Sequence, residues 1–327
     1  MVNMEQNQFK CSHLNKRSIF LLPLFYLGMI ASPNSAYAIN WEYVNGSSGY
    51  DHADGKPSNM TDQSSLMPAD LLTKVQELLP EGISISANPK VLAMLANSEG
   101  ANIKLKAPAD ISVSYIFEKA DYLSAIGYFK FPKDNLASLT VSTLKDTIIF
   151  PNFSDSVLQY GQSVKLGSFQ AGDAIGFTMA ADGWYQGEVD PNQSVNNIFR
   201  TIKRLNPEKD SKLQDHTLLL AYPEKELMVV MFEDLNRENA ALNHYSISSD
   251  DDFNDAIIAV QVSPWSSVDC SNCNYLVPPT TTTTSLKGES GQISWREITA
   301  PVVVADPLKD AKAAAKAAEE AAKNSVP

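Results

Sequence analysis

The sequence predicts an all-β protein: an antiparallel β-sandwich of jelly-roll type, with a short helical N-terminal segment and a C-terminal alanine-rich helical tail. Between residues 102 and 262 the hydrophobic pattern has a period of two, in about nine short runs rich in β-branched and aromatic residues. Gly, Pro, Asn and Asp separate the runs, and no helices alternate with them, which disfavours a parallel sheet. The predicted strands are 102–107, 111–117, 125–131, 146–150, 163–167, 174–180, 216–222, 227–232 and 255–262.

The N-terminus has the three parts of a secretory signal. Lys16 and Arg17 precede an apolar stretch over 19–30, and Ala36-Tyr37-Ala38 forms a small-residue cleavage site. A short membrane anchor is the alternative, but the apolar stretch is short for a bilayer and contains a proline. We expect export by the Sec-type route, to the periplasm, the cell surface or the medium, and no transmembrane segment after cleavage.

Two short helices are predicted ahead of the strands. Residues 39–68 are polar and rich in Gly, Ser, Asn and Asp, so they contribute few core side chains. Apolar residues then recur at helical spacing over 67–82, until a proline and a glycine end the pattern. The run 89–96 is a candidate second helix, and the run 195–205 fits either a strand or a helix.

The chain changes character after residue 262. Prolines and five successive threonines over 278–285 form a stiff, low-complexity linker, and residues 294–305 could add one strand. The C-terminal stretch is a strong helix former, with Asp306 as a cap and Pro307 suited to the first turn. Its only apolar face is alanine with one leucine, which favours a solvated tail over a partner-binding helix.

Two cysteines lie beyond the predicted signal. Cys270 and Cys273 form a CSNC motif, for which a small-loop disulfide is the simplest interpretation in an oxidising compartment. A redox dithiol would normally begin a helix after a strand, and a metal pair would need two more soft ligands.

The charge balance disfavours nucleic acid as a partner. The chain carries a formal charge of −12, and removal of residues 1–38, with three basic residues and one acid, changes this to −14. An acidic surface repels phosphate backbones and concentrates cations.

Sequence motifs for common catalytic sites are absent: GxSxG, HExxH, the P-loop and GxGxxG after a strand. His52, His216 and His244 are far apart in the chain, and each is more typical of a surface or hydrogen-bonded histidine than of a ligand or base.

The most unusual stretch is SSDDDFND, residues 248–255, directly before a predicted strand. Asp250, Asp252 and Asn254 alternate, as oxygen ligands do at the start of calcium loops. An EF-hand is excluded, because Asp255 stands where its glycine belongs and Gln261 where its bidentate glutamate belongs.

A second acidic pair, Glu233 and Asp234, ends the preceding apolar run. If the two runs are neighbouring antiparallel strands, both acidic groups lie at the same end of the sheet. About six side-chain oxygens would then converge, which fits the six to eight that Ca²⁺ takes. A solvated turn rich in Asp and Asn is the alternative, and the spacing alone leaves both open.

Several motifs resemble the DUF4114 family of bacterial secreted domains. The stretches FEDL (232–235) and SDDDFNDAII (249–258) are similar to its closing signature. Three further segments match in the same order, over roughly 110–262: IFEKADYLSAIGYFKF, IIFPNFS and VKLGSFQAGDAIGFTMAADGW. The lead-in WEYVNGSSGYD is similar to that of LruC-domain proteins of Gram-negative bacteria.

The resemblance implies a β-sandwich with a calcium site and no assigned enzyme activity. Carried onto this sequence, it implies a ligand set of Glu233, Asp234, Asp250, Asp252, Asn254 and Asp255. Phe253 is expected to point away from the oxygens and anchor the loop in the core. Trp184 is expected to pack over the sandwich edge, with stacking on a sugar as the alternative.

We therefore divide the chain into five parts: a signal peptide (1–38), a polar lead-in with short helices (39–108), a DUF4114-like domain (109–263), a linker (264–304) and the tail (305–327). The expected function is a calcium-binding module without enzyme activity that binds surface or matrix polymers, with polysaccharide or other envelope proteins as partners. The alternatives are a structural subunit of a surface fibre or envelope layer and, less favoured, a glycan hydrolase that uses the aspartates.

Overall fold

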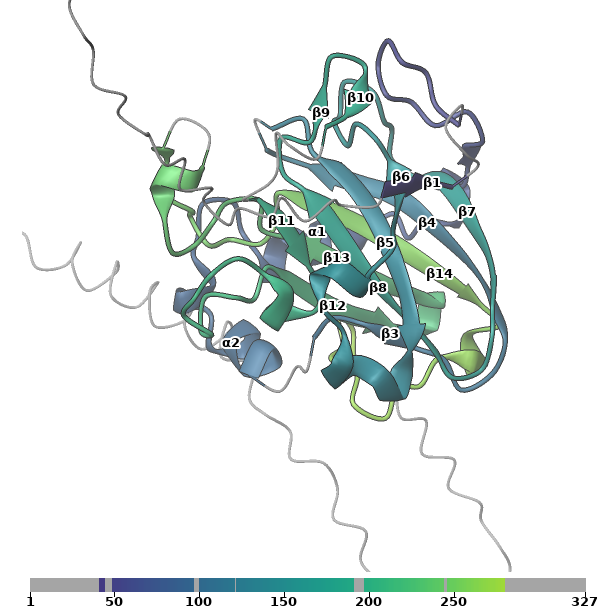
Figure 1. Ribbon diagram of the computed structural model, residues 1–327. Helices are drawn as coiled ribbons and strands as arrows, with labels where there is room; N and C mark the ends of the chain where they lie inside the picture. Colours follow the sequence, from purple (N-terminus) through teal and green to yellow (C-terminus); the bar gives the residue numbers. More distant parts are fainter. Residues whose placement is uncertain are drawn as a thin grey trace, which may run out of the picture. The chain divides into compact units, whose positions relative to one another are not determined.

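The computed structural model describes residues 41–44, 49–96, 100–120, 122–190, 197–243 and 246–279, and their fold is mostly β with antiparallel sheets (Figure 1). Each of the nine predicted strands coincides with an observed one. The predicted signal, the threonine-rich stretch from 280, the candidate strand 294–305 and the tail lie outside these residues. Among the described helices, none combines the length and the apolar character needed to cross a membrane.

The first sheet has six strands in the described part of the chain. Its order is β1-β6-β5-β8-β11, and β3 also pairs with β8. All these pairs are antiparallel except β1 with β6. The strands are β1 Trp41–Tyr43, β3 Ile103–Lys104, β5 Ala125–Pro132, β6 Asp146–Phe150, β8 Asp173–Ala180 and β11 Ile198–Arg200.

The second sheet is antiparallel throughout and has the order β12-β13-β14-β4-β7-β2. Its strands are β2 Thr61–Asp62, β4 Ala109–Glu118, β7 Gln162–Phe169, β12 Thr217–Tyr222, β13 Leu227–Phe232 and β14 Ala256–Ser263. A separate hairpin joins β9 Trp184–Tyr185 to β10 Glu188–Val189.

The strands β12, β13 and β14 of the second sheet are buried on both faces, which explains their continuous apolar runs. Successive side chains of β13 point to opposite faces. Met228, Val230 and Phe232 join an apolar cluster that also contains side chains of the first sheet. Their neighbours Val229 and Met231 join a second cluster, formed with two helices.

The two helices, α1 Leu71–Leu78 and α2 Pro89–Ala96, supply that second layer. The apolar spacing predicted α1: Leu71, Val75 and Leu78 are buried. Full burial of such a side chain contributes about 1.5–3 kcal/mol. The helical segment therefore covers the outer face of the second sheet.

The lead-in also contributes strands that the sequence did not predict. β1 pairs with β6 and β2 pairs with β7, each over two or three residues. Such strands are too short to show a period. The ambiguous run 195–205 resolves into β11 followed by a 3₁₀ turn at Lys203–Leu205.

Candidate metal centre

The ends of β13 and β14 bring the two acidic groups together, as predicted from the strand order. The strands pair antiparallel with Phe232 opposite Ala256. Glu233 follows β13 directly, and Asp255 directly precedes β14. The amide of Asp255 donates to the carbonyl of Phe232 (3.1 Å), and the amide of Asp234 donates to Oδ2 of Asp255 (2.8 Å).

The loop before β14 has an unusual backbone. Asp251 and Phe253 have φ values of 62° and 61°, a left-handed conformation that non-glycine residues seldom adopt. Phe253 is fully buried in the cluster formed with the helices, which agrees with its predicted role as an anchor. The hydroxyl of Ser249 donates to Oε1 of Glu233 (2.8 Å). The loop is thus held at two points, by the burial of Phe253 and by the hydrogen bond of Ser249.

The turn after α1 closes over this loop. The amide of Gly82 donates to Oδ2 of Asp252 (2.7 Å), and the amide of Ile85 donates to the carbonyl of Asp251 (2.7 Å). The side-chain amide of Asn254 donates to the carbonyl of Leu79 (3.3 Å). Sequence reasoning missed this contact, because the partners are about 170 residues apart.

Glu81, in the same turn, adds a further carboxylate. Burial raises its pKa, and the nearby charge of Asp252 raises it further. The sequence offered no signal for Glu81, since a lone exposed-looking glutamate after a helix is ordinary.

Five of the six predicted ligands fall into two sets of carboxylates whose oxygens lie within 4.8 Å of one another. One set is Glu233, Asp250 and Asp252, and the other is Glu233, Asp234 and Asp255. Asn254, the sixth, is buried beside them with its amide nitrogen on Leu79. Glu233, Asp234 and Asp252 are at most 4% exposed, whereas Asp250 is exposed.

Burial and mutual repulsion raise the pKa of several of these carboxylic acids. Burial raises the pKa of Glu233 well above its usual value, and the charge of Asp234 adds to the effect. Burial likewise raises the pKa of Asp255, with Asp234 and Glu233 as the next causes. The pKa of Asp250 is also raised, by partial burial of its carboxyl group and then by Asp252, although the residue as a whole is exposed.

The cationic side chain of Arg237, close to this loop, already has hydrogen-bond partners. Arg237 donates from Nε to Oδ1 of Asp251 and from a terminal nitrogen to the carbonyl of Asp215 (2.9 Å). Its guanidinium lies over the ring of Phe253, 5.1 Å from the ring centre. Oε2 of the fully buried Glu233, by contrast, makes no hydrogen bond.

The oxygens gathered here are of the type that a hard cation takes. Ca²⁺ prefers carboxylate and carbonyl oxygens in a flexible shell.

The remaining residues considered from the sequence have structural contacts. His216 is buried, with Nε2 2.8 Å from Oε1 of Glu208 and its ring stacked on Phe199. His52 is exposed beside the carbonyl of Gly187, and His244 lies outside the described residues. Trp184 is 7% exposed and packs edge-on against Tyr50, so its ring is not available as a sugar platform.

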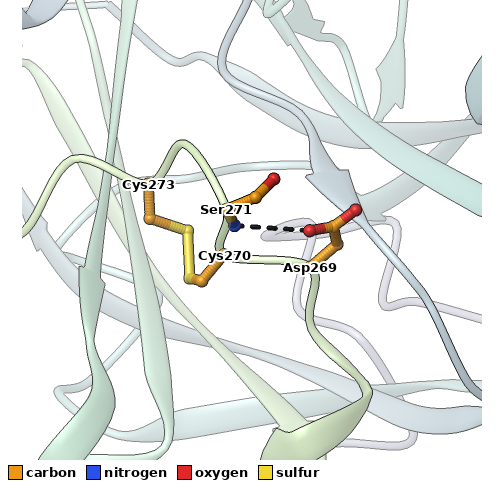
Figure 2. The surroundings of a disulfide bond; sticks show 4 residues. All are labelled: Asp269, Cys270, Ser271 and Cys273. Carbon is orange, nitrogen blue, oxygen red and sulfur yellow. Dashed lines mark hydrogen bonds between the residues drawn. A yellow bond between two sulfur atoms is a disulfide. The ribbon is translucent and has the colours of Figure 1, made fainter.

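Cys270 and Cys273 are joined in a disulfide, as Figure 2 shows. The loop is also held by Asp269, whose Oδ1 accepts from the amide of Ser271 (3.3 Å). Hydrogen bonding from Ser271, through its side chain and then through its backbone amide, lowers the pKa of Asp269.

Residues 169–263 match the model of a family described as a domain of unknown function, DUF4114. The match confirms the suspected family and contains β8 to β14 and both acidic groups, but it begins at 169, whereas the resemblance was expected from about 110. The strands β1 to β6 and nearly all of β7 precede it. No curated protein and no solved structure matches the chain.

Proposed function

We propose that this protein is a secreted β-sandwich module without enzyme activity that binds calcium at the acidic cluster and serves in surface or matrix binding. The observation that carries the proposal is Oε2 of Glu233, a buried carboxylate oxygen without a hydrogen bond among further carboxylates. The two sheets that share one apolar cluster support the sandwich.

Charge is the physical reason for a cation. Two like charges 4 Å apart repel by about 4 kcal/mol at the effective dielectric constant near a protein surface. Arg237 offsets Asp251, which belongs to neither carboxylate set, and within each set the carboxylate oxygens lie within 4.8 Å of one another. The raised pKa values of Glu233 and Asp255 have the same origin, since burial and neighbouring carboxylates both disfavour the ionised form. A divalent cation would offset this repulsion.

In this proposal Glu233, Asp234, Asp250, Asp252 and Asp255 hold the ion, and Asn254 remains a predicted sixth ligand. The ion would tie the ends of β13 and β14 to the loop between them. Through Asp252 and Gly82 it would also tie them to the turn after α1. Binding only to the folded state stabilises it by mass action, by about 4 kcal/mol at a thousand times Kd.

The extracytoplasmic location rests on the signal-like residues 1–38 and on the disulfide, which is typical of oxidising compartments. Extracellular calcium suffices for sites with millimolar dissociation constants. Polysaccharide as the bound polymer rests on family-level analogy alone.

The test is calcium titration of the chelator-treated protein by calorimetry and thermal melting. We expect saturable binding and a rise in Tm on the order of 10 °C at saturation. The Asp250→Ala/Asp252→Ala double variant should lose both effects. The control, Asp134→Ala/Asp210→Ala, removes the same charge from exposed positions outside the cluster and should retain them. No heat and no shift in the unaltered protein would sink the proposal.

A further inference from the structure

The acidic cluster is divided into two parts that share a single residue. Glu233 belongs both to the set with Asp250 and Asp252 and to the set with Asp234 and Asp255. The first set lies in the loop before β14, under the turn after α1. The second lies at the strand ends, where Oδ2 of Asp255 accepts from the amide of Asp234.

The charge of the cluster exceeds what one divalent ion neutralises. The two sets together hold five carboxylates, and three of these residues are at most 4% exposed. Arg237 is committed to Asp251, which belongs to neither set. An ion in the first set would leave the carboxylates of Asp234 and Asp255 within 4.8 Å of each other, and an ion in the second set would leave those of Asp250 and Asp252.

Glu233 has the geometry of a bridging ligand. Its Oε1 accepts from the hydroxyl of Ser249 (2.8 Å) and from the amide of Leu235 (3.4 Å), which fixes the carboxylate plane. Its Oε2 has no hydrogen bond, although the residue is fully buried. A fixed, unpartnered oxygen common to two carboxylate sets is what two neighbouring cations require.

We propose that the cluster binds two divalent cations bridged by Glu233, one held by Asp250 and Asp252 and the other by Asp234 and Asp255. This inference rests on the proposed function, since it specifies how many ions the same cluster takes. Carboxylate-bridged ions in proteins lie about 3.5–4 Å apart. The first subsite contains exposed Asp250 and should exchange its ion faster than the second, whose Asp234 is buried.

The experiment counts ions on the full chain. Chelator-treated protein is loaded with Ca²⁺, and bound ions are counted by native mass spectrometry and by calorimetric stoichiometry. We expect two per chain, and one in Asp250→Ala or in Asp234→Ala. Glu233→Gln should weaken both steps by tenfold or more. The control Asp134→Ala should retain two, and circular dichroism checks that each variant is folded.

The outcomes separate the two proposals. A single ion on the unaltered chain overturns the two-ion site and leaves the calcium module standing, whereas no ion overturns both. Two ions that persist in both single-aspartate variants would place at least one elsewhere, which also overturns the bridged site. If Asp234→Ala does not fold, the count on the unaltered chain and on Asp250→Ala decides.

Discussion

Two of the buried carboxylates in the described part of this protein, Asp146 and Glu233, are held in different ways. In the first sheet Asp146 is paired with Arg200, Oδ2 to a terminal nitrogen at 2.9 Å, and both side chains are 3% exposed. Oδ1 of Asp146 accepts from the hydroxyl of Thr178. Beyond the second sheet, Glu233 is equally buried but has only Ser249 and a backbone amide on one oxygen.

Asp146 and Glu233 differ in the elements that supply the side chains around them. Asp146, Thr178 and Arg200 are on strands of one sheet, and the pairing of β8 with β11 sets Arg200 opposite Thr178. The neighbours of Glu233 are on loops and are mostly acidic. A buried acid that the chain itself neutralises is structural, whereas one surrounded by further acids is a candidate ligand for a cation.

The largest effect is expected where the pair is internal. Arg200→Met should lower the free energy of unfolding by about 3–5 kcal/mol, because it leaves Asp146 buried and uncompensated. Chemical denaturation should show the same loss with and without calcium. The exposed pair of Lys145 with Glu42 (3.3 Å) is the control, and Lys145→Met should cost under about 1 kcal/mol. If calcium reversed the loss of stability in Arg200→Met, the distinction between the Asp146–Arg200 pair and the acidic cluster would be wrong.

At the acidic cluster, unlike at the Asp146–Arg200 pair, we expect the stability of the metal-free protein to depend on the protonation of its buried acids. Glu233 and Asp255 have raised pKa values, so the folded state retains protons that the unfolded chain has released. Their contribution is full below the ordinary carboxyl pKa of about 4–4.5 and is lost as pH rises through the raised values.

Without calcium, the free energy of unfolding should therefore rise on acidification from neutral pH towards pH 5, by up to about 1.4 kcal/mol per pH unit and proton. Tm should rise with it. Saturating calcium should flatten or reverse this slope, because it favours the ionised form. A metal-free Tm that falls steadily over the same range would show that these carboxylates are not the dominant titrating groups.

Neutralising the two acids should have effects of opposite sign. In metal-free protein Glu233→Gln should raise the free energy of unfolding by about 1 kcal/mol, or roughly 2–4 °C in Tm, since glutamine is neutral without the proton that buried Glu233 must take up at neutral pH. Asp146→Asn should destabilise, because it strips Arg200 of its partner. Destabilisation of similar size in both variants would remove the distinction between the regions.

The smallest effect on the fold is expected at the exposed edge of the cluster. Asp250→Asn should change metal-free stability by under about 0.5 kcal/mol. Its calcium affinity should nevertheless fall about tenfold, or roughly 1.4 kcal/mol, because a charged ligand is lost. An unchanged calorimetric Kd would remove Asp250 from the site.

Much of the fold was predictable because long apolar runs with a period of two constrain the backbone strongly. The nine strands and the helix over 71–78 correspond to such runs. The adjacency of Glu233 and Asp255 was also predictable, because consecutive strands usually pair with each other. The two-residue strand β2 was not, since two residues show no period and its place depends on a partner far along the chain.

By itself, the sequence determined which residues are acidic, where the strands that carry them begin and end, and that Phe253 belongs to the core. Only the tertiary structure decided which charges are neutralised. Arg200 reaches Asp146 across 54 residues, and the turn at Gly82 reaches Asp252 across 170. The physical reason is that burial and pairing depend on which distant segments pack together, and neither can be read from neighbours in the chain.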